Sequence, residues 1–390
     1  MPSYMSYLRQ VAVVDGDDDI QWITVKGNHI PIKKGQSKED AINKFFESKN
    51  GGGKSKKEEP KKTESVVSKP KVGSVPLKKY TVKSILERAN KSKGDDSVTE
   101  SYVISEAVKN NKNKYTEAEL KQRAKNYDDY RQKHTIQTIE SQTTGGHWED
   151  GDYVGYEWKP ERRELQRKIL NEVSFKNILD KLPKEGEKPK LVLLGGRGGS
   201  GKSKFTYESE DENVLGEDAY DANKFVVIDP DKYKERLPEY KNLVEKGDKY
   251  AGLNAWEVHE ESSAMKKMAL DNALQIGANV VLDGTMAKYK SVKKTLDKFR
   301  EKGYIIDVAF MELPRELSAI RGINRGMRVN KKTNARIGRW VPVPVMLGMT
   351  DCEENFEKLS KDADHWVLYH NEVPEGQKPK LVAKGGKNGK

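Results

Sequence analysis

A glycine-rich stretch, GGRGGSGKS, follows the apolar run LVLL and has the spacing G-x-x-x-x-G-K-S. Glycines at these places let backbone N–H groups turn inward around phosphate oxygens, the lysine adds positive charge, and the serine hydroxyl can bind Mg²⁺. The sequence therefore predicts an ATP site with Mg²⁺, in which Ser203 is the metal ligand. Its residues are Gly196, Arg197, Gly198, Gly199, Ser200, Gly201, Lys202 and Ser203.

Acidic residues end two further apolar runs. KFVVIDPDKY places Asp229 and Asp231 after one run, and NVVLDGT places Asp283 and Thr285 after another. The carboxyl ends of parallel strands meet at the edge of an α/β sheet where ligands bind. One carboxylate there can lie toward Mg²⁺ while another accepts a proton from an attacking hydroxyl. From the residues alone, Asp231 fits the N-cap of a short helix equally well.

Arginines follow these acidic segments. RGINRGMR places Arg321, Arg325 and Arg328 three or four residues apart, on one helix face. RIGRW adds Arg336 and Arg339. Each one alone suits a solvated surface, but phosphoryl transfer to a hydroxyl needs positive charge around the moving group. As a set they favour a kinase.

The elements that position these residues alternate along the second half of the chain. Short apolar runs are separated by amphipathic helical patterns, which predicts a parallel sheet covered on both faces. The expected fold class is α/β, a P-loop kinase-like doubly wound parallel sheet over residues 160–372. We expect helices over residues 161–182, 256–276, 288–302 and 314–327.

The remainder of the chain divides by composition. Residues 1–48 form a small module with a hairpin around KGNH and a short helix after Ser37. Residues 49–79 are a disordered basic linker, and residues 373–390 a disordered basic tail. Residues 80–159 are mostly helical and end in an aromatic hairpin, HWEDGDYVGYEW, for which packing is favoured over base stacking.

The net charge of +11 comes from 72 Lys and Arg against 61 Asp and Glu. This surplus suits nucleic acid, an anionic metabolite or solvated Lys-rich tails. Cys352 is the only cysteine, which excludes a disulfide framework and a thiolate metal cluster. The first twenty residues lack the apolar core of a signal peptide, and no stretch reaches transmembrane length. We expect a soluble, cytoplasmic protein without a membrane partner.

The order GGRGGSGKS, VVIDPDKYKERLPEY, NVVLDGT, INR and GRWVPVP, over about residues 160–345, resembles the zeta toxin family of P-loop kinases. The resemblance implies a phosphotransferase that uses ATP and Mg²⁺ to phosphorylate an alcohol group of a nucleotide sugar, UDP-N-acetylglucosamine.

The resemblance also implies a role for each site residue. Lys202 and Ser203 would contact phosphate and Mg²⁺, and Asp231 would be the general base. Asp283 and Thr285 would contact the substrate, with Asp229 beside them. Arg325 and Arg339 would clamp phosphates. The chain departs from the pattern at Lys267, where the best-known toxins carry a substrate-binding glutamate.

Partners are implied in the same way. Family members are often restrained by helical antitoxins, so an antitoxin-like inhibitor is expected, either separate or supplied in cis by residues 80–142. HIPIKKGQS resembles a module of bacteriophage structural and head-associated proteins, which implies virion partners in a bacterial host. Two alternatives stay open: a nucleic-acid 5′-hydroxyl kinase, and a phage structural or packaged protein that carries a P-loop fold.

Overall fold

In the computed structural model, the chain forms two compact units, Met1–Lys78 and Lys79–Lys390. The described residues are 20–25, 28–33, 81–93, 98–109, 116–123, 125–126, 142–149, 152–246, 255, 257–329, 338–339, 341–373 and 377–387.

The first unit contains a hairpin. β1 (Ile20–Val25) pairs antiparallel with β2 (Asn28–Lys33), and Ile23 lies opposite Ile30. The hairpin predicted around KGNH is therefore confirmed. The helix predicted after Ser37 and the linker at residues 49–79 lie outside the described residues.

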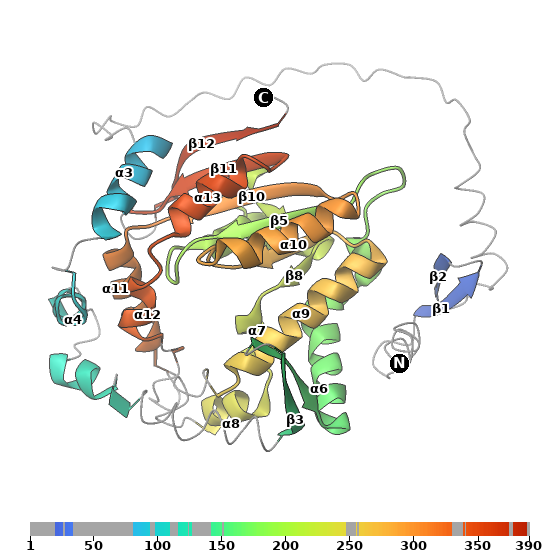
Figure 1. Ribbon diagram of the computed structural model, residues 1–390, viewed down its shortest axis with the longest axis horizontal. Coiled ribbons are helices and arrows are strands. Elements are labelled where there is room, and N and C mark those ends of the chain that lie inside the picture. The colour runs from blue at the N-terminus through green and yellow to red at the C-terminus, as the bar shows by residue number, and fades with distance from the viewer. Residues whose placement is uncertain are drawn as a thin grey trace. The chain divides into compact units, whose positions relative to one another are not determined.

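The second unit is built on a six-stranded sheet with the order β12-β11-β10-β5-β9-β8 (Figure 1). Five strands are parallel, and β12 pairs antiparallel with β11. The predicted α/β class with a mostly parallel sheet is confirmed. The strands are β5 (Lys190–Gly195), β8 (Val226–Ile228), β9 (Val280–Asp283), β10 (Ile305–Glu312), β11 (His365–His370) and β12 (Lys380–Gly386).

Strand β12 corrects the prediction of a disordered tail over residues 373–390. An edge strand tolerates its lysines because one side faces solvent. Lys384 illustrates this: its Nζ atom lies 2.5 Å from Oε1 of Glu217, while its backbone pairs with Val367.

Alternation along the strands places apolar side chains on both faces of the sheet. On one face, Leu191 and Leu193 share a buried cluster with Met265, Leu296 and Phe356. These last three belong to helices of which Figure 1 shows α10 and α13 in front of the sheet. The helices over this face are α6 (Pro160–Leu170), α9 (His259–Ile276), α10 (Tyr289–Glu301) and α13 (Cys352–Ser360).

The opposite face is covered differently from the prediction. Val192 and Leu194 pack against Phe205, Leu215 and Phe225. These come from a segment of 3₁₀ turns and the short strands β6 (Thr206–Tyr207) and β7 (Tyr220–Asp221), not from an amphipathic α-helix. The segment is rich in Asp and Glu and lacks a helical apolar period, which explains the difference.

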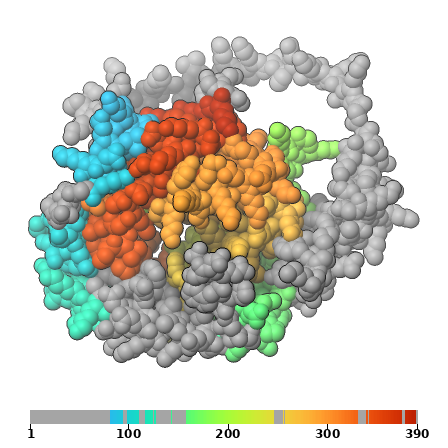
Figure 2. All heavy atoms as spheres, in the orientation of Figure 1, coloured from blue at the N-terminus to red at the C-terminus, as the bar shows by residue number. Residues whose placement is uncertain are grey.

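Helices precede the sheet, as expected for residues 80–159. They are α3 (Val82–Lys93) and α4 (Glu100–Lys109), and the aromatic hairpin is confirmed as β3 (Thr143–Glu149) and β4 (Asp152–Trp158). Val103 and Ile104 of α4 are buried against Ala319 and Ile323 of α11 (Arg315–Gly326), together with α12 (Val343–Leu347). In Figure 2 the atoms of α3 lie directly against those of the C-terminal helices. This region therefore shares the core of the second unit.

Helix bounds mostly follow the prediction. α9, α10 and α11 lie within the expected ranges, and Trp256 lies outside the described residues. The helix predicted over residues 161–182 is broken: α6 ends at Leu170, and a π turn and a 3₁₀ turn follow. Asn177 adopts a left-handed conformation with φ of 53°, which interrupts the helical backbone. No described helix has both the length and the apolar character needed to span a bilayer.

Candidate active site

The glycine-rich loop lies at the centre of the sheet. It follows β5, which is flanked by β9 on one side and β10 on the other. The chain reverses its direction of strand addition there, and ligands of open α/β sheets bind at such a point. Gly201 has φ of 90°, and a Cβ atom on it would lie 2.5 Å from Nδ2 of Asn371. A side chain at this position would both strain the backbone and displace the neighbouring strand end.

Residues from two other elements support the loop. Oγ of Ser318 on α11 donates to the carbonyl oxygen of Gly198 at 2.6 Å. Nδ2 of Asn371, which follows β11, donates to the carbonyl oxygen of Ser200 at 2.6 Å. Nη2 of Arg321 donates to the carbonyl oxygen of Asn371 at 3.1 Å. Sequence reasoning missed Ser318 and Asn371, although a polar residue after WVLYH obeys the strand-end rule that found the aspartates.

Arg197 is one of the predicted nucleotide-binding residues of the glycine-rich loop. Its side chain is buried and forms a bidentate ion pair with Glu353, with Nη2 2.6 Å from Oε2. Nε donates to the carbonyl oxygen of Met349 at 2.8 Å. Burial lowers the pKa of Arg197, but the Glu353 carboxylate raises it more, so the guanidinium stays charged. The side chain anchors the loop to α13, so that only the backbone of Arg197 is left to contact a bound phosphate.

The element directly after the loop is a 3₁₀ turn over Lys202–Phe205, not an α-helix. Phosphate binding would therefore depend on the loop amides and the lysine charge rather than on a helix dipole. Ser203 is exposed, so its hydroxyl is accessible to a ligand.

Lys202 contacts a predicted substrate residue. Its Nζ atom lies 3.4 Å from Oδ1 of Asp283, at the end of the neighbouring strand β9. Burial raises the pKa of Asp283 to about 6, Lys202 opposes that shift, and the charges of Asp229 and Asp231 add to it. The carboxylates that follow β8 and β9 are thus close enough to influence each other's protonation.

The helix that follows β8 is capped by Asp229 and not by Asp231. Oδ1 of Asp229 accepts from the backbone N–H of Asp231 at 2.9 Å and so caps helix α7 (Pro230–Lys234). The sequence had offered Asp231 as the cap. Because Asp229 performs this task, the carboxylate of Asp231 is directed to other partners. Tyr233 secures α7 below, since its hydroxyl lies 2.7 Å from Oγ of the buried Ser174.

Positive charges surround Asp231. Nζ of Lys234 lies 3.1 Å from its Oδ1, and Nη2 of Arg339 lies 3.5 Å from its Oδ2. Burial would raise the pKa of Asp231, but Lys234, Arg339 and Arg325 together lower it well below its ordinary value. Asp231 is therefore ionised at neutral pH.

The predicted arginines converge from different segments. A Cβ atom on Gly338 would lie 1.8 Å from the carbonyl oxygen of Arg325, so the chain before Arg339 passes against the end of α11. Arg339 also lies 2.9 Å from Glu235, between Nη1 and Oε1. Burial, and then the charge of Arg339, lower the pKa of Arg325. Arg336 lies outside the described residues.

The loop after β9 holds Thr285. Its Oγ1 accepts from the backbone N–H of Ala287 at 3.3 Å. Between them, Met286 is buried with φ of 59°, an uncommon conformation for a residue with a side chain. Nδ2 of Asn355 donates to its carbonyl oxygen at 2.8 Å and holds this conformation in place. The sequence contains no signal for this strained residue.

Lys267 is the position at which the sequence departs from the family pattern. Its side chain is exposed, whereas the preceding Lys266 is half-buried on α9. Burial lowers the pKa of Lys266, and the charges of Asp283 and Asp229 oppose that shift. Lys266 on α9 therefore lies within electrostatic range of the predicted substrate residues.

Among the described residues, no group of three His, Cys, Asp or Glu side chains could hold a metal ion by itself. A Mg²⁺ ion bound with a nucleotide does not need such a group, because phosphate oxygens and water supply most of its ligands. The exposed Ser203 hydroxyl and the Asp283 carboxylate near Lys202 fit that kind of site.

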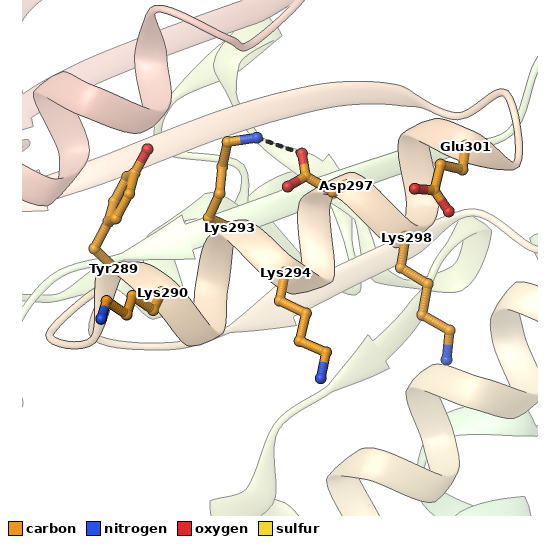
Figure 3. A pocket seen from close by; sticks show the side chains of 7 residues that line it. All are labelled: Tyr289, Lys290, Lys293, Lys294, Asp297, Lys298 and Glu301. Atoms are coloured by element: carbon orange, nitrogen blue, oxygen red, sulfur yellow. Dashed lines mark hydrogen bonds and ion pairs between the residues drawn. The ribbon is translucent and has the colours of Figure 1, made fainter.

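A separate hollow of about 520 Å³ lies on the outer side of α10 and contains none of the predicted site residues (Figure 3). Its side chains include Lys290, Lys294 and Lys298, which extend to one side of the helix in the figure. Lys298 is paired with Asp271 at 2.5 Å. The hollow is a basic surface feature and adds no group to the site around the glycine-rich loop.

Comparison with known proteins places this site in a family. The family model described as Zeta toxin matches residues 176–375. Over 142 residues the chain is 24% identical to Toxin PezT of Streptococcus pneumoniae serotype 4. The aligned region covers 36% of this chain and 52% of that protein. The chain thus spans about half the length of the curated relative it matches. These matches give no support to the bacteriophage-type module expected at residues 1–48.

Solved structures with a similar fold include AvrRxo1-ORF1:-ORF2 with ATP, with a TM-score of 0.43 and 20% identity over 59% of this chain and 71% of that one. Another comes from the PezAT chromosomal toxin–antitoxin system of Streptococcus pneumoniae. It has a TM-score of 0.40 and 19% identity over 58% of this chain and 81% of that one.

Proposed function

Because the chain belongs to the zeta toxin family, we propose that it is a phosphotransferase that moves the γ-phosphate of ATP to an alcohol group. The proposed acceptor is a nucleotide sugar such as UDP-N-acetylglucosamine. One observation carries the proposal: Asp283, at the end of β9, pairs with Lys202 of the glycine-rich loop, and Asp231, which follows the neighbouring strand β8, pairs with Arg339.

In the proposed reaction, the loop amides and Lys202 hold the outer phosphates of ATP. Ser203 and Asp283 would hold Mg²⁺, which would supply positive charge to the phosphate oxygens. Arg325 and Arg339 would neutralise the charge that spreads over the moving phosphoryl group. The acceptor hydroxyl would lie beside Asp231 and lose its proton to that carboxylate as its oxygen bonds to the γ-phosphorus. The bond from that phosphorus to the bridging oxygen would break in the same step, and ADP would leave.

The low pKa of Asp231 sets a condition on this mechanism. A carboxylate paired with Lys234 and Arg339 is a weak base. If Arg339 turns to the phosphate when ATP binds, Asp231 loses one of the charges that lower its pKa and becomes more basic. The arginine pair would then couple nucleotide binding to activation of the acceptor. Asp283, with a pKa of about 6, is the rival for the role of base, which it could fill only if Ser203 holds Mg²⁺ without it.

An acceptor panel tests the proposal. The protein is incubated with Mg²⁺, γ-labelled ATP and a mixture of nucleotide sugars, nucleosides and 5′-hydroxyl oligonucleotides. We expect label on a nucleotide sugar, and none with the K202M variant. Label on the oligonucleotides would instead support the alternative, a nucleic-acid 5′-hydroxyl kinase.

We also propose a bacterial cytoplasmic setting and a separate antitoxin-like inhibitor. Helix α4 argues against inhibition in cis by residues 80–142, because Val103, Ile104 and Ala107 are buried in one cluster with α11 and α12. Removing these residues would expose the apolar surface of α11, the helix whose Ser318 supports the glycine-rich loop. Expression in bacteria tests this: the wild-type chain should arrest growth and K202M should not, and unimpaired growth with an active enzyme would contradict it.

A further inference from the structure

A buried cluster connects helix α3 to the ends of two sheet strands. Glu312 and His370 are register partners at the ends of β10 and β11, and both are buried. Nδ1 of His370 donates to the Glu312 carboxylate, and Nη2 of Arg88 on α3 donates to its other oxygen. Nη1 of Arg88 also reaches Glu372 at 3.3 Å. Arg88 therefore bridges the strand end and the residues that follow it.

The residue directly after β11 carries this arrangement to the glycine-rich loop. The backbone N–H of Asn371 donates to the carbonyl oxygen of Glu312 at 3.0 Å, so Asn371 is fixed to the same strand end. Its side chain donates to the carbonyl oxygen of Ser200 at 2.6 Å and fits closely against Gly201. A small shift of the β11 end would therefore move the loop that cradles phosphate.

We propose that Arg88 is a positioning residue for nucleotide binding, acting through Glu312, His370 and Asn371 on the glycine-rich loop. Arg88 lies before residues 176–375, the segment that matches the family, so the N-terminal helices would complete the nucleotide site. The inference rests on the proposed function only in taking this loop as the ATP site.

The physical reason is the burial of Glu312. A buried carboxylate needs charged or hydrogen-bonding partners, and removal of one partner leaves it undercompensated. The Glu312 carboxylate would then turn toward solvent and shift the strand end. Such a shift alters the hydrogen bonds that orient Asn371, and phosphate binding depends on loop geometry to a fraction of an ångström.

Helix α3 has other attachments, which make a clean variant feasible. Ile85 is buried in the main core, and Nη2 of Arg315 donates to the carbonyl oxygen of Ser92 at 2.5 Å. Lys93 lies 2.6 Å from Glu354 and 2.9 Å from Asp351. Replacing Arg88 should therefore leave α3 docked. Lys93→Met is a control on the same helix, because it removes two ion pairs that do not involve Glu312, His370 or Asn371.

The test measures ATP affinity by calorimetry for the full-length wild type, R88M, R88K, K93M and K202M. We expect R88M to raise the dissociation constant about tenfold, R88K to raise it less, and K93M to leave it unchanged. Hydrogen exchange of the loop peptide should rise in R88M alone. A wild-type dissociation constant in folded R88M overturns the inference, and if R88M does not fold, a wild-type value in R88K does so.

The variants separate this inference from the proposed function. If K202M abolishes ATP binding while R88M and R88K bind ATP like the wild type, only the role of Arg88 fails. If K202M binds ATP like the wild type, the loop is not the ATP site and both ideas fail.

Discussion

Lys202 and Asp283 form an ion pair between the glycine-rich loop and the end of β9, with Nζ and Oδ1 3.4 Å apart. The pair joins the predicted donor side of the site to the predicted acceptor side, because β5 and β9 are hydrogen-bonded neighbours. Phosphates entering the loop would compete with Asp283 for the lysine. Binding of a nucleotide would thus also change the charge around the strand-end carboxylates.

The raised pKa of Asp283 predicts a pH-dependent gain in stability for D283N. The folded value is about 6 and the unfolded value about 3.9, so the folded state binds more protons between them. The free energy of unfolding contributed by this group therefore falls as pH rises from about 4 to about 6 and stays low above. At about pH 8, D283N should be more stable by roughly 2 kcal/mol in urea denaturation. An equal gain at about pH 4 would contradict this.

The pH dependence of kcat/KM distinguishes the two possible bases. If Asp231 is the base, its low pKa places the acidic limb well below pH 6, and D231N should lower kcat by about 10²- to 10⁴-fold. If Asp283 is the base, the limb lies near pH 6 and disappears in D283N. Steady-state rates across pH for both variants decide between the two residues.

Two substitutions of Asp229 test whether its side chain stabilises the protein as a helix cap. Its carboxylate caps α7, so D229A should lower the free energy of unfolding by about 1 kcal/mol. Asn is as good a cap as Asp, and D229N should keep wild-type stability. Thermal unfolding measures both variants. If D229N lost as much stability as D229A, the cap would not be the reason.

The packing of α4 on α11 predicts a large loss of stability for I104A. Ile104 is 2% exposed in the cluster with Ala319 and Ile323, and truncation of such a residue costs about 2–5 kcal/mol. Tyr102 on the same helix is 47% exposed, and Y102A should change stability by less than about 0.5 kcal/mol. Equal losses in the two variants would mean that α4 is not part of this core.

Local sequence patterns predicted the sheet and the acidic residues at the carboxyl ends of its strands. Apolar runs indicated the five parallel strands, and strand-end polarity pointed to Asp231 and Asp283, which lie at one edge of the sheet. These features are local, because apolar period and strand-end position depend on neighbouring residues alone. The lysine-rich strand β12 was missed because an edge position is a property of the whole sheet.

The support of the site could not be predicted for a similar reason. Arg197 pairs with Glu353, 156 residues away, and Asp229 rather than Asp231 caps α7. A sequence indicates that a residue can bond, but not which of several competing partners lies within reach. Lys266 and Lys267 illustrate this point, because adjacent residues of a helix point in different directions. Lys267 is exposed, and it is Lys266 whose pKa is affected by Asp283 and Asp229.

Mass spectrometry of UDP-N-acetylglucosamine, after incubation with ATP, Mg²⁺ and the protein, tests the proposed phosphoryl transfer itself. We predict that the wild-type chain adds one phosphate to the sugar portion, and that K202M and D231N add none although both remain folded. A folded, ATP-binding wild-type chain that leaves this and every other nucleotide sugar unmodified would contradict the proposed function.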